Sequence, residues 1–177
     1  AVAGVLREAV AKGAGSALIH TGGFREAGSG DLEEELSDIS KEHGLRLLGP
    51  NIQGMSYLPN KLCAMFWPVM TVLGPLGIVS QSGTVTGALA EWAADEGLGT
   101  SAAVNLGNQV DLCESDIIDF LADDEFTKAI VLYLEGVKDG RRFLETAKRA
   151  VKRKPLVVMK SGRTPGGQAA TASHTGS

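Results

Sequence analysis

A short glycine-containing turn holds residues of this sequence that could bind an anion. Ser80, Gln81, Ser82, Gly83 and Thr84 follow an apolar run and precede a helical pattern. Backbone N–H groups at a helix start have no partners inside the helix and bind anions, and a glycine there allows close approach. The hydroxyl of Ser82 or Thr84 would add a contact. The pattern therefore indicates a phosphate site. The alternative is an ordinary serine cap that only starts the helix.

A histidine and a glutamate could act together with that turn. His174 lies in a run of small and polar residues, 172–177, where a histidine is most often exposed and inert. Glu135 ends a strongly apolar run, where a carboxylate either faces water or fixes the second nitrogen of an imidazole. An anion carried on His174 could rest on the amides of Ser82 and Gly83. The sequence therefore supports the hypothesis that His174 carries phosphate.

Alternating strand and helix patterns position these residues. The apolar runs that predict strands are Ser16–His20, Leu45–Leu48, Gly77–Ser80, Thr100–Leu106, Ala129–Leu134 and Pro155–Lys160. The helical patterns cover 2–12, 31–43, 81–96, 115–121 and 141–153. This alternation favours right-handed crossovers and a parallel sheet. We therefore expect an α/β fold, with the C-terminal half of a Rossmann-like domain followed by a flavodoxin-like parallel-sheet domain.

The helical patterns also predict caps and buried faces. Asp31 is expected to cap the second helix. The large apolar residues that we expect to face inward include Val5, Leu32, Trp92, Leu144 and Val151.

Three segments follow from these patterns. Residues 1–56 predict the closing half of a doubly wound unit, residues 57–74 a proline-containing irregular connector, and residues 75–177 a second α/β unit. The chain begins inside a helical pattern and ends in a loop of small residues. We therefore expect it to be part of a longer protein.

The carboxyl ends of the expected parallel strands all carry small or polar residues. They read Ser80–Gly83, Gly107–Asn108, Glu135–Gly136 and Lys160–Gly162. In parallel α/β sheets, ligands bind at this edge. The four ends should share one rim, which predicts a binding site there.

Composition limits the classes of function. The chain is 44% apolar with 23 glycines, which suits a parallel sheet with tight turns. A net charge of −4 without a basic stripe argues against binding nucleic acid. No apolar run reaches membrane length and no signal peptide is visible, so we expect no membrane partner and a cytoplasmic location. Cys63 and Cys113 lack metal-ligand spacing, so no metal site is expected.

Several motifs together resemble a known family. In chain order they are Thr21-Gly22-Gly23-Phe24 with Glu26, Gly49-Pro50-Asn51 with Gly54, Gly77-Ile78-Val79-Ser80-Gln81-Ser82-Gly83, Gly107-Asn108 with Asp111, Glu135, Lys160-Ser161-Gly162-Arg163 and Ser173-His174-Thr175-Gly176. The ordered set resembles the NDP-forming acyl-CoA synthetases of the ADP-forming acetyl-CoA synthetase type, relatives of succinyl-CoA synthetase. Each motif alone is unspecific, and their order and spacing carry the likeness.

The resemblance implies a ligase that works in two stages. Acyl-CoA and phosphate would give an acyl phosphate and CoA, and the phosphoryl group would pass to a histidine and then to ADP. His174 matches the phosphorylated histidine, Glu135 matches the carboxylate that holds it, and Ser80–Thr84 match the helix start that stabilises the phosphate. The residues implied for the CoA and acyl site are Gly22, Gly23, Asn51 and Asn108.

The same resemblance implies partners and excludes one substrate. Residues 1–56 would close a CoA-binding domain, and an ATP-grasp domain or subunit outside this chain would bind ADP or ATP with Mg²⁺. The substrates would be a small acid, CoA and phosphate, and an oligomer is expected. Gln81 stands where succinyl-CoA synthetase has arginine, and Ser173 and Thr175 replace its glycine and alanine around the histidine. These differences argue against a succinate enzyme.

Two other interpretations stay open at this point. The first is a catalytically silent module that senses CoA or acyl-CoA, as in a fusion to an acetyltransferase. The second is a generic flavodoxin-like domain without phosphate chemistry.

Overall fold

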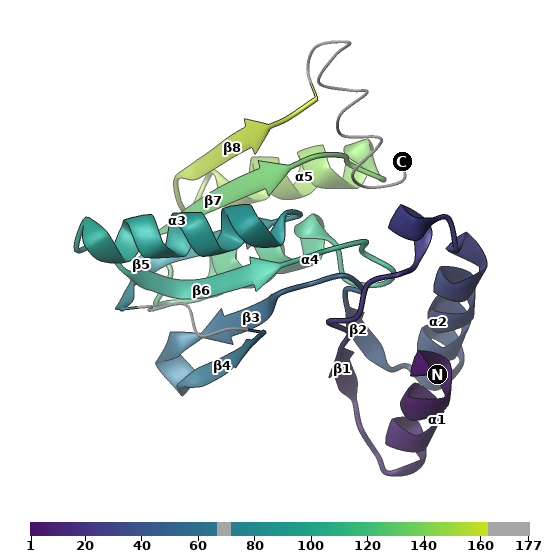
Figure 1. Cartoon of the computed structure of the whole chain (residues 1–177). Coiled ribbons are helices and arrows are strands. Elements are labelled where there is room, and N and C mark those ends of the chain that lie inside the picture. The colour runs from purple at the N-terminus through teal and green to yellow at the C-terminus, as the bar shows by residue number, and fades with distance from the viewer. Residues whose placement is uncertain (67–71, 163–177) are drawn as a thin grey trace.

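The computed structural model describes residues 1–66 and 72–162, and its largest element is a six-stranded sheet (Figure 1). The strands are β3 (Gly54–Tyr57), β4 (Leu62–Met65), β5 (Leu73–Ser80), β6 (Thr100–Asn105), β7 (Ala129–Leu134) and β8 (Leu156–Lys160). Their order is β4-β3-β6-β5-β7-β8, and β5 to β8 are parallel. The parallel strands thus lie in the order second, first, third, fourth, as in flavodoxin-like folds. The expected α/β class is confirmed.

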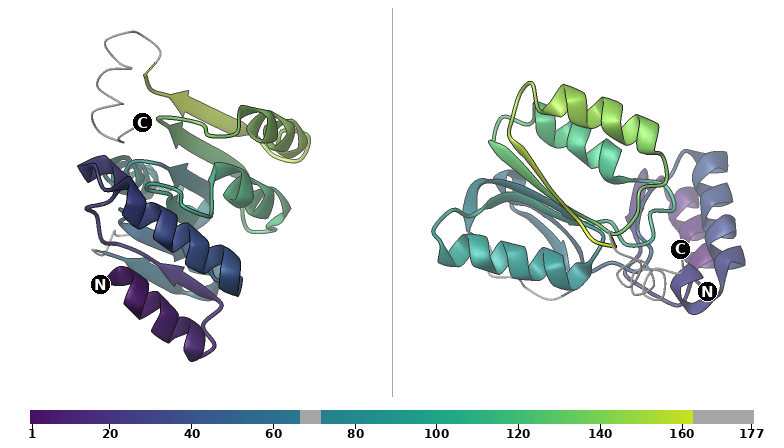
Figure 2. Two further views of the ribbon diagram at one scale, coloured as in Figure 1. Left: turned by 90° about the vertical axis from the view of Figure 1, so that its right-hand side faces the viewer. Right: turned by 90° about the horizontal axis from the view of Figure 1, so that it is seen from above.

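Helices cover both faces of this sheet (Figure 2). Helix α3 (Gly83–Asp95) lies on one face, and α4 (Glu114–Asp123) and α5 (Gly140–Ala150) lie on the other. The main core lies between the sheet, α4 and the loops around them. Its fully buried side chains include Ile118, Leu121, Ile130, Leu132 and Leu134. Because β5 to β8 are all parallel, their carboxyl ends lie at one edge of the sheet.

The N-terminal unit is a small α/β layer beside that edge (Figure 1). Its elements are α1 (Val2–Ala11), β1 (Ser16–Leu18), the 3-10 helix η1 (Arg25–Ala27), α2 (Gly30–His43) and β2 (Arg46–Leu48). Strands β1 and β2 pair in parallel. The residues that form its core include Leu6, Phe24, Leu36, Ile39 and Leu47. The predicted helix–strand–helix–strand order is confirmed.

Residues 57–66 contain regular structure that the sequence did not predict. Strands β3 and β4, with the 3-10 helix η2 (Leu58–Asn60) between them, form a hairpin, and β3 pairs antiparallel with β6. The predicted irregular connector is wrong here, and the sheet is mixed rather than all-parallel. The hairpin strands have four residues each, too few to produce a clear alternating pattern.

Several buried faces also differ from the prediction. The large apolar residues that are exposed instead of buried are Val5, Leu32, Trp92, Leu144 and Val151. Smaller residues such as Ala90 and Ala150 take the buried positions. A helix close to a sheet presents a narrow stripe, and small side chains there allow the close approach. Helix α2 follows Ser29 as its N-cap residue, so the predicted cap at Asp31 is also wrong.

The loop after β6 joins the two units. Arg46 donates from Nε and Nη2 to the carboxylate of Asp111, at 2.9 and 3.2 Å. The same carboxylate accepts from the backbone N–H of Leu47 at 2.8 Å. The backbone N–H of Asn108 donates to the carbonyl of Pro50 at 2.9 Å. These contacts fix the N-terminal unit against the carboxyl edge of the large sheet.

Candidate active site at the carboxyl edge of the sheet

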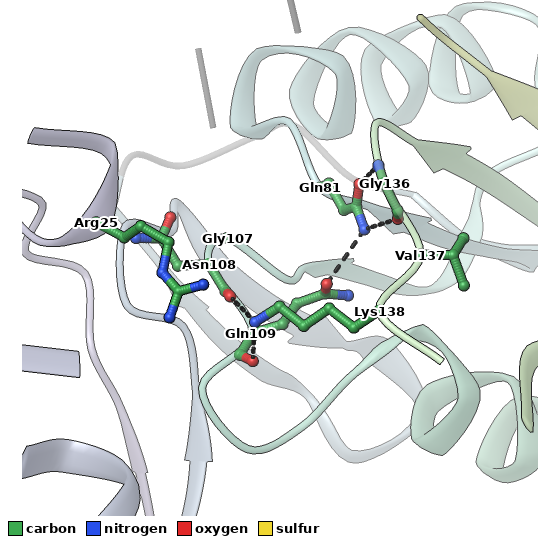
Figure 3. A pocket seen from close by; sticks show the side chains of 8 residues that line it. All are labelled: Arg25, Gln81, Gly107, Asn108, Gln109, Gly136, Val137 and Lys138. Carbon is green, nitrogen blue, oxygen red and sulfur yellow. Dashed lines mark hydrogen bonds between the residues drawn. The ribbon is translucent and has the colours of Figure 1, made fainter. Parts of the chain in front are cut away.

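Gln81 links the ends of β5 and β7, where the strand order reverses (Figure 3). Its Oε1 accepts from the backbone N–H groups of Glu135 and Gly136, at 2.5 and 2.9 Å. Its Nε2 donates to the carbonyl of Gly136 at 2.7 Å and to Oε1 of Gln109 at 3.2 Å. Ligands of doubly wound folds bind at this switch point. The structure therefore brings the predicted strand ends together.

The turn into α3 is held by its own serines. Ser82 caps the helix, because its Oγ accepts from the backbone N–H of Val85 at 3.4 Å. Ser80 is fully buried, and its Oγ donates to the carbonyl of Ser82 at 2.8 Å and accepts from its N–H at 3.1 Å. The amides of Gly83 and Thr84 have no acceptor within the helix. The positive end of the helix dipole is thus suited to an anion.

Gly83 also has a packing role that the sequence did not reveal. A Cβ atom at Gly83 would lie 2.6 Å from Cγ of Gln53. The backbone N–H of Gln53 in turn donates to Oδ1 of Asn105 at 2.7 Å, next to β5. The space left by the missing side chain therefore accommodates Gln53, so an anion would approach along the N–H groups rather than over the glycine Cα.

Glu135 directly follows β7 on the same rim and is half-buried. Its backbone carbonyl accepts from Nζ of Lys160 at 2.8 Å, which joins the ends of β7 and β8. The expected partner of its carboxylate, His174, lies outside the described residues. Pairing between Glu135 and a histidine therefore stays a prediction.

A second polar group forms where the N-terminal unit meets the loop after β6. Nδ2 of Asn51 donates to Oδ1 of Asn108 at 3.3 Å. A Cβ atom at Gly22 would lie 3.3 Å from Oδ1 of Asn51 and 3.2 Å from Oε1 of Glu26. The N–H of Gly23 donates to the same Glu26 oxygen at 2.5 Å. The four residues predicted for the CoA and acyl site thus lie together, although they come from distant parts of the sequence.

Two carboxylates orient Asn108. Its Nδ2 donates to Oε1 of Glu33 at 2.6 Å and also to Oε2 of Glu26. Glu33 is 3% exposed and pairs with Nε of Arg25 at 3.2 Å. Burial opposes ionisation of Glu26, but hydrogen bonds from Asn108 and the N–H of Gly23 outweigh it and lower its pKa. The side-chain amide of Asn108 is therefore held with its oxygen toward Asn51.

A cavity of about 210 Å³ lies between the switch point and this second group (Figure 3). The residues that line it are Arg25, Gln81, Gly107, Asn108, Gln109, Gly136, Val137 and Lys138. Nζ of Lys138 donates to the carbonyls of Asn108 and Gln109 at 2.8 and 2.9 Å. Burial, followed by the positive charge of Arg25, lowers the pKa of Lys138. The cavity therefore has an electropositive wall.

Sequence reasoning missed Arg25, Gln109 and Lys138 as site residues. Each is close in sequence to a predicted residue, since Arg25 precedes Glu26, Gln109 follows Asn108, and Lys138 comes shortly after Glu135. That proximity was the available signal. An arginine or lysine at the surface is usually solvated, so the residue types of Arg25 and Lys138 gave no reason to select them as site residues.

Other classes of site find no support in the part of the chain that the structure describes. Residues 1–66 and 72–162 contain no group of three or more His, Cys, Asp or Glu side chains placed to hold a metal ion. No helix within these ranges is long and apolar enough to cross a membrane. Burial raises the pKa of the Cys113 thiol, which donates to Oδ2 of Asp116 at 3.1 Å. Cys113 therefore serves the start of α4 as a neutral thiol.

These features define a doubly wound α/β protein with a polar cavity beside its switch point. Residues 73–177, more than half of the chain, match the family described as the succinyl-CoA ligase like flavodoxin domain, and the chain belongs to this family. The family resemblance predicted from the motifs is thus confirmed.

The relatives extend the likeness over nearly the whole chain. The chain is 46% identical to the α subunit of ADP-forming acetate–CoA ligase I from Pyrococcus furiosus, over 98% of this chain and 38% of that protein. It is 43% identical to an ADP-forming acetate–CoA ligase from Methanocaldococcus jannaschii, over 98% of this chain and 24% of that protein. The solved structure of a dinucleotide forming acetyl-coenzyme A synthetase 1 from Ca. Korarchaeum cryptofilum, in complex with phosphate and ADP, superposes with a TM-score of 0.94. That comparison has 42% identity and covers 99% of this chain and 38% of the other. The chain thus spans less than two fifths of each relative.

Proposed function

We propose that this chain is the α-type portion of an NDP-forming acyl-CoA ligase, which interconverts acyl-CoA, phosphate and ADP with acid, CoA and ATP. The observation that carries the proposal is the network at Gln81, which holds the turn bearing Glu135 beside the start of α3. A carboxylate can hold an imidazole ring, and the N–H groups at a helix start can bind the phosphate that the ring carries. The reaction class is supported by the relatives, which are ADP-forming acetate–CoA ligases.

The proposed reaction has three transfers. Phosphate displaces CoA from acyl-CoA and gives an acyl phosphate and the free thiol. An imidazole nitrogen of His174 then attacks phosphorus, the carboxylate of the acid leaves, and a phosphohistidine forms. Finally ADP takes the phosphoryl group, which gives ATP and restores the histidine. The part assigned to His174 rests on its sequence motif, because this residue lies outside the described ranges.

The described residues have distinct roles in this proposal. The carboxylate of Glu135 would accept a hydrogen bond from one ring nitrogen and leave the other nucleophilic. The amides of Gly83 and Thr84 would stabilise the negative charge of the phosphoryl group during transfer. The hydroxyls of Ser80 and Ser82 act indirectly, because both are used within the turn.

The CoA substrate would lie against the N-terminal unit. Gly22 and Gly23 help to line a second cavity of about 210 Å³ between Thr21, Phe24 and Leu36. Their lack of side chains leaves the backbone open to a long, narrow ligand. Bound CoA supplies the thiol that accepts or releases the acyl group. The ADP or ATP, with Mg²⁺, would bind to an ATP-grasp domain or subunit in the complete ligase, which we expect to be an oligomer.

Phosphoenzyme formation tests this function. The complete ligase, with its ATP-grasp domain or subunit, is incubated with γ-labelled ATP and Mg²⁺ and is expected to gain an acid-labile and base-stable phosphate. The variant His174→Ala should lose the label, because no other residue is proposed to carry phosphate. His43→Ala is the matched control, since His43 is exposed at the end of α2. Label that persists in His174→Ala would refute the assignment.

A further inference from the structure

Two cationic side chains from different units reach the same cavity. Arg25 belongs to η1 in the N-terminal unit, and Lys138 belongs to the loop between β7 and α5. Figure 3 shows both side chains extending toward the space that also exposes Gln109 and Gly107. The positive charge of Arg25 contributes to the lowered pKa of Lys138, so the two cations act on each other across this space.

Among the described residues, both cations keep hydrogen-bond donors that could serve a ligand. The ion pair between Arg25 and Glu33 uses Nε, at 3.2 Å, and leaves the two terminal nitrogens of the guanidinium. Lys138 uses two of its three N–H donors on the carbonyls of Asn108 and Gln109. The remaining donors belong to charged groups, whose hydrogen bonds to an anion are stronger than neutral ones.

The carboxylate of Glu33 pairs with Arg25, whereas the ion pairs of the described residues include none with Lys138. Within the described residues, the buried carboxylate of Glu33 also accepts from Asn108 and from the backbone N–H of Arg25. The partners of Lys138 in its hydrogen bonds are neutral carbonyls. A charged hydrogen bond between an ammonium group and an anion is stronger than one to a neutral carbonyl. An oxyanion in the cavity would supply that partner to Lys138.

The position of the cavity indicates which oxyanion. One wall contains Gln81 and Gly136, which adjoin Glu135, and the opposite wall contains Asn108, which is bonded to Asn51. A ligand here would lie between the turn proposed to hold the histidine and the proposed CoA site. A small carboxylate or acyl phosphate suits this position, because it must reach both sides.

We propose that Arg25 and Lys138 bind the oxyanion of the acid substrate and of the acyl phosphate formed from it. This inference rests on the proposed ligase function and adds the residues that recognise the negative charge of the reacting group. The same two residues would hold the carboxylate when the reaction makes acyl-CoA and the phosphoryl oxygens when it makes ATP.

Binding of acetyl phosphate to the full-length protein tests the proposal without turnover. The protein carries His174→Ala, so that phosphoryl transfer to the histidine is blocked, and binding is measured by titration calorimetry. Arg25→Gln and Lys138→Met are each expected to raise the Kd at least about tenfold, the effect of losing one charged hydrogen bond. Arg7→Gln is the matched control, because Arg7 also pairs with a glutamate of α2, Glu35, at 3.0 Å.

The outcomes separate this proposal from the proposed function. Arg25→Gln is the decisive variant, since Lys138→Met also removes hydrogen bonds to two backbone carbonyls. An unchanged Kd in Arg25→Gln, or no binding of acetyl phosphate before mutation, would overturn the oxyanion site. A raised Kd for CoA with an unchanged Kd for acetyl phosphate would also overturn it. Failure of the ligase function would show instead as absent phosphoenzyme from ATP in the protein with intact His174.

Discussion

Gln81 shows how much one side chain contributes to this site. Its amide oxygen accepts from the N–H groups of Glu135 and Gly136, and its amide nitrogen donates to the carbonyl of Gly136 and to Gln109. A glutamate could only accept in this place, and an arginine could only donate. The side-chain amide therefore matches the turn after β7 in a way that neither charged residue can.

Substitution of Gln81 should reduce one half-reaction more than the other. In Gln81→Leu, two backbone N–H groups lose their acceptor, which costs about 2 kcal/mol or more of unfolding free energy. The turn that bears Glu135 loosens, so labelling of the protein by acyl phosphate should slow at least about tenfold, or about 1.4 kcal/mol. Labelling by ATP should change little, because the nucleotide half-reaction belongs to another part of the ligase.

Gln81→Glu is the control for this prediction. It keeps the acceptor for Glu135 and Gly136 and loses only the donors, so the slowing should be intermediate. Rapid-quench labelling from the two directions measures both rates. An unchanged acyl-phosphate rate in Gln81→Leu would contradict the positioning role.

The sequence predicted some site residues and could not predict others. Gly22, Asn51 and Asn108 stand in motifs with turn-forming glycines, and the structure brings them together. The residue types of Arg25 and Lys138 gave no reason to select them, because an arginine or lysine is usually solvated, and only their proximity to predicted residues pointed to them. Their shared cavity depends on how two units meet, which local sequence does not encode.

The loop after β6 shows a constraint at the level of one element. Gly107 adopts φ of 55°, and a Cβ atom there would lie 2.6 Å from the carbonyl oxygen of Asn51 and closer still to that of Pro50. The loop thus passes directly against the segment after β2. Close backbone approach at this point places Asn108 and Gln109 at the cavity.

Gly107→Ala should therefore destabilise the protein strongly. The added methyl group forces two backbone segments apart, and a loss of more than about 2 kcal/mol in unfolding free energy is expected. Gly13→Ala is the matched control, because Gly13 also has a positive φ, 83°, but open space around its Cα. In Gly13→Ala, the unfolding free energy should fall only by the cost of a positive φ for alanine, about 1 kcal/mol. Urea unfolding of both variants measures the difference, and equal losses would contradict the packing argument.

In the molecule as a whole, the candidate site forms where two units meet at one edge of the large sheet. The N-terminal unit supplies Arg25, Glu26 and Asn51, and the large sheet supplies Gln81 and Lys138. Figure 1 shows the small unit at the carboxyl ends of the parallel strands. Their relative position therefore decides the shape of the cavity.

Asp111 is the side chain that should couple the units most strongly. In Asp111→Ala, the N–H of Leu47 loses its acceptor and Arg46 loses both hydrogen bonds. The expected loss is about 2 kcal/mol, because a hydrogen bond to a charged group contributes more than a neutral one. Hydrogen exchange should accelerate at the amides of Leu47 and Asn108.

An exposed ion pair provides the comparison. Asp119 pairs with Arg149 at 2.9 Å between α4 and α5, and both side chains are largely open to solvent. Asp119→Ala should cost less than about 1 kcal/mol and leave exchange at Leu47 unchanged. Equal effects of the two substitutions would show that Asp111 does not couple the units.

Local sequence was sufficient to predict the helices and strands of much of this protein. The run of β7 and the start of α3 were predicted closely, because apolar periodicity and serine caps act through neighbouring residues. Four strand ends with polar residues predicted the rim, since parallel strands end at a common edge. The ordered motifs predicted the family, which the comparison with known proteins confirmed.

The contacts between distant segments could not be predicted from local sequence. The β3–β4 hairpin, the exposure of Trp92, the contact of Gln53 with Gly83 and the meeting of Arg25 with Lys138 all depend on distant segments. Periodicity reports which residues share a face, but not which neighbour covers that face or how closely it approaches. The electropositive cavity is therefore a product of tertiary contacts between the two units.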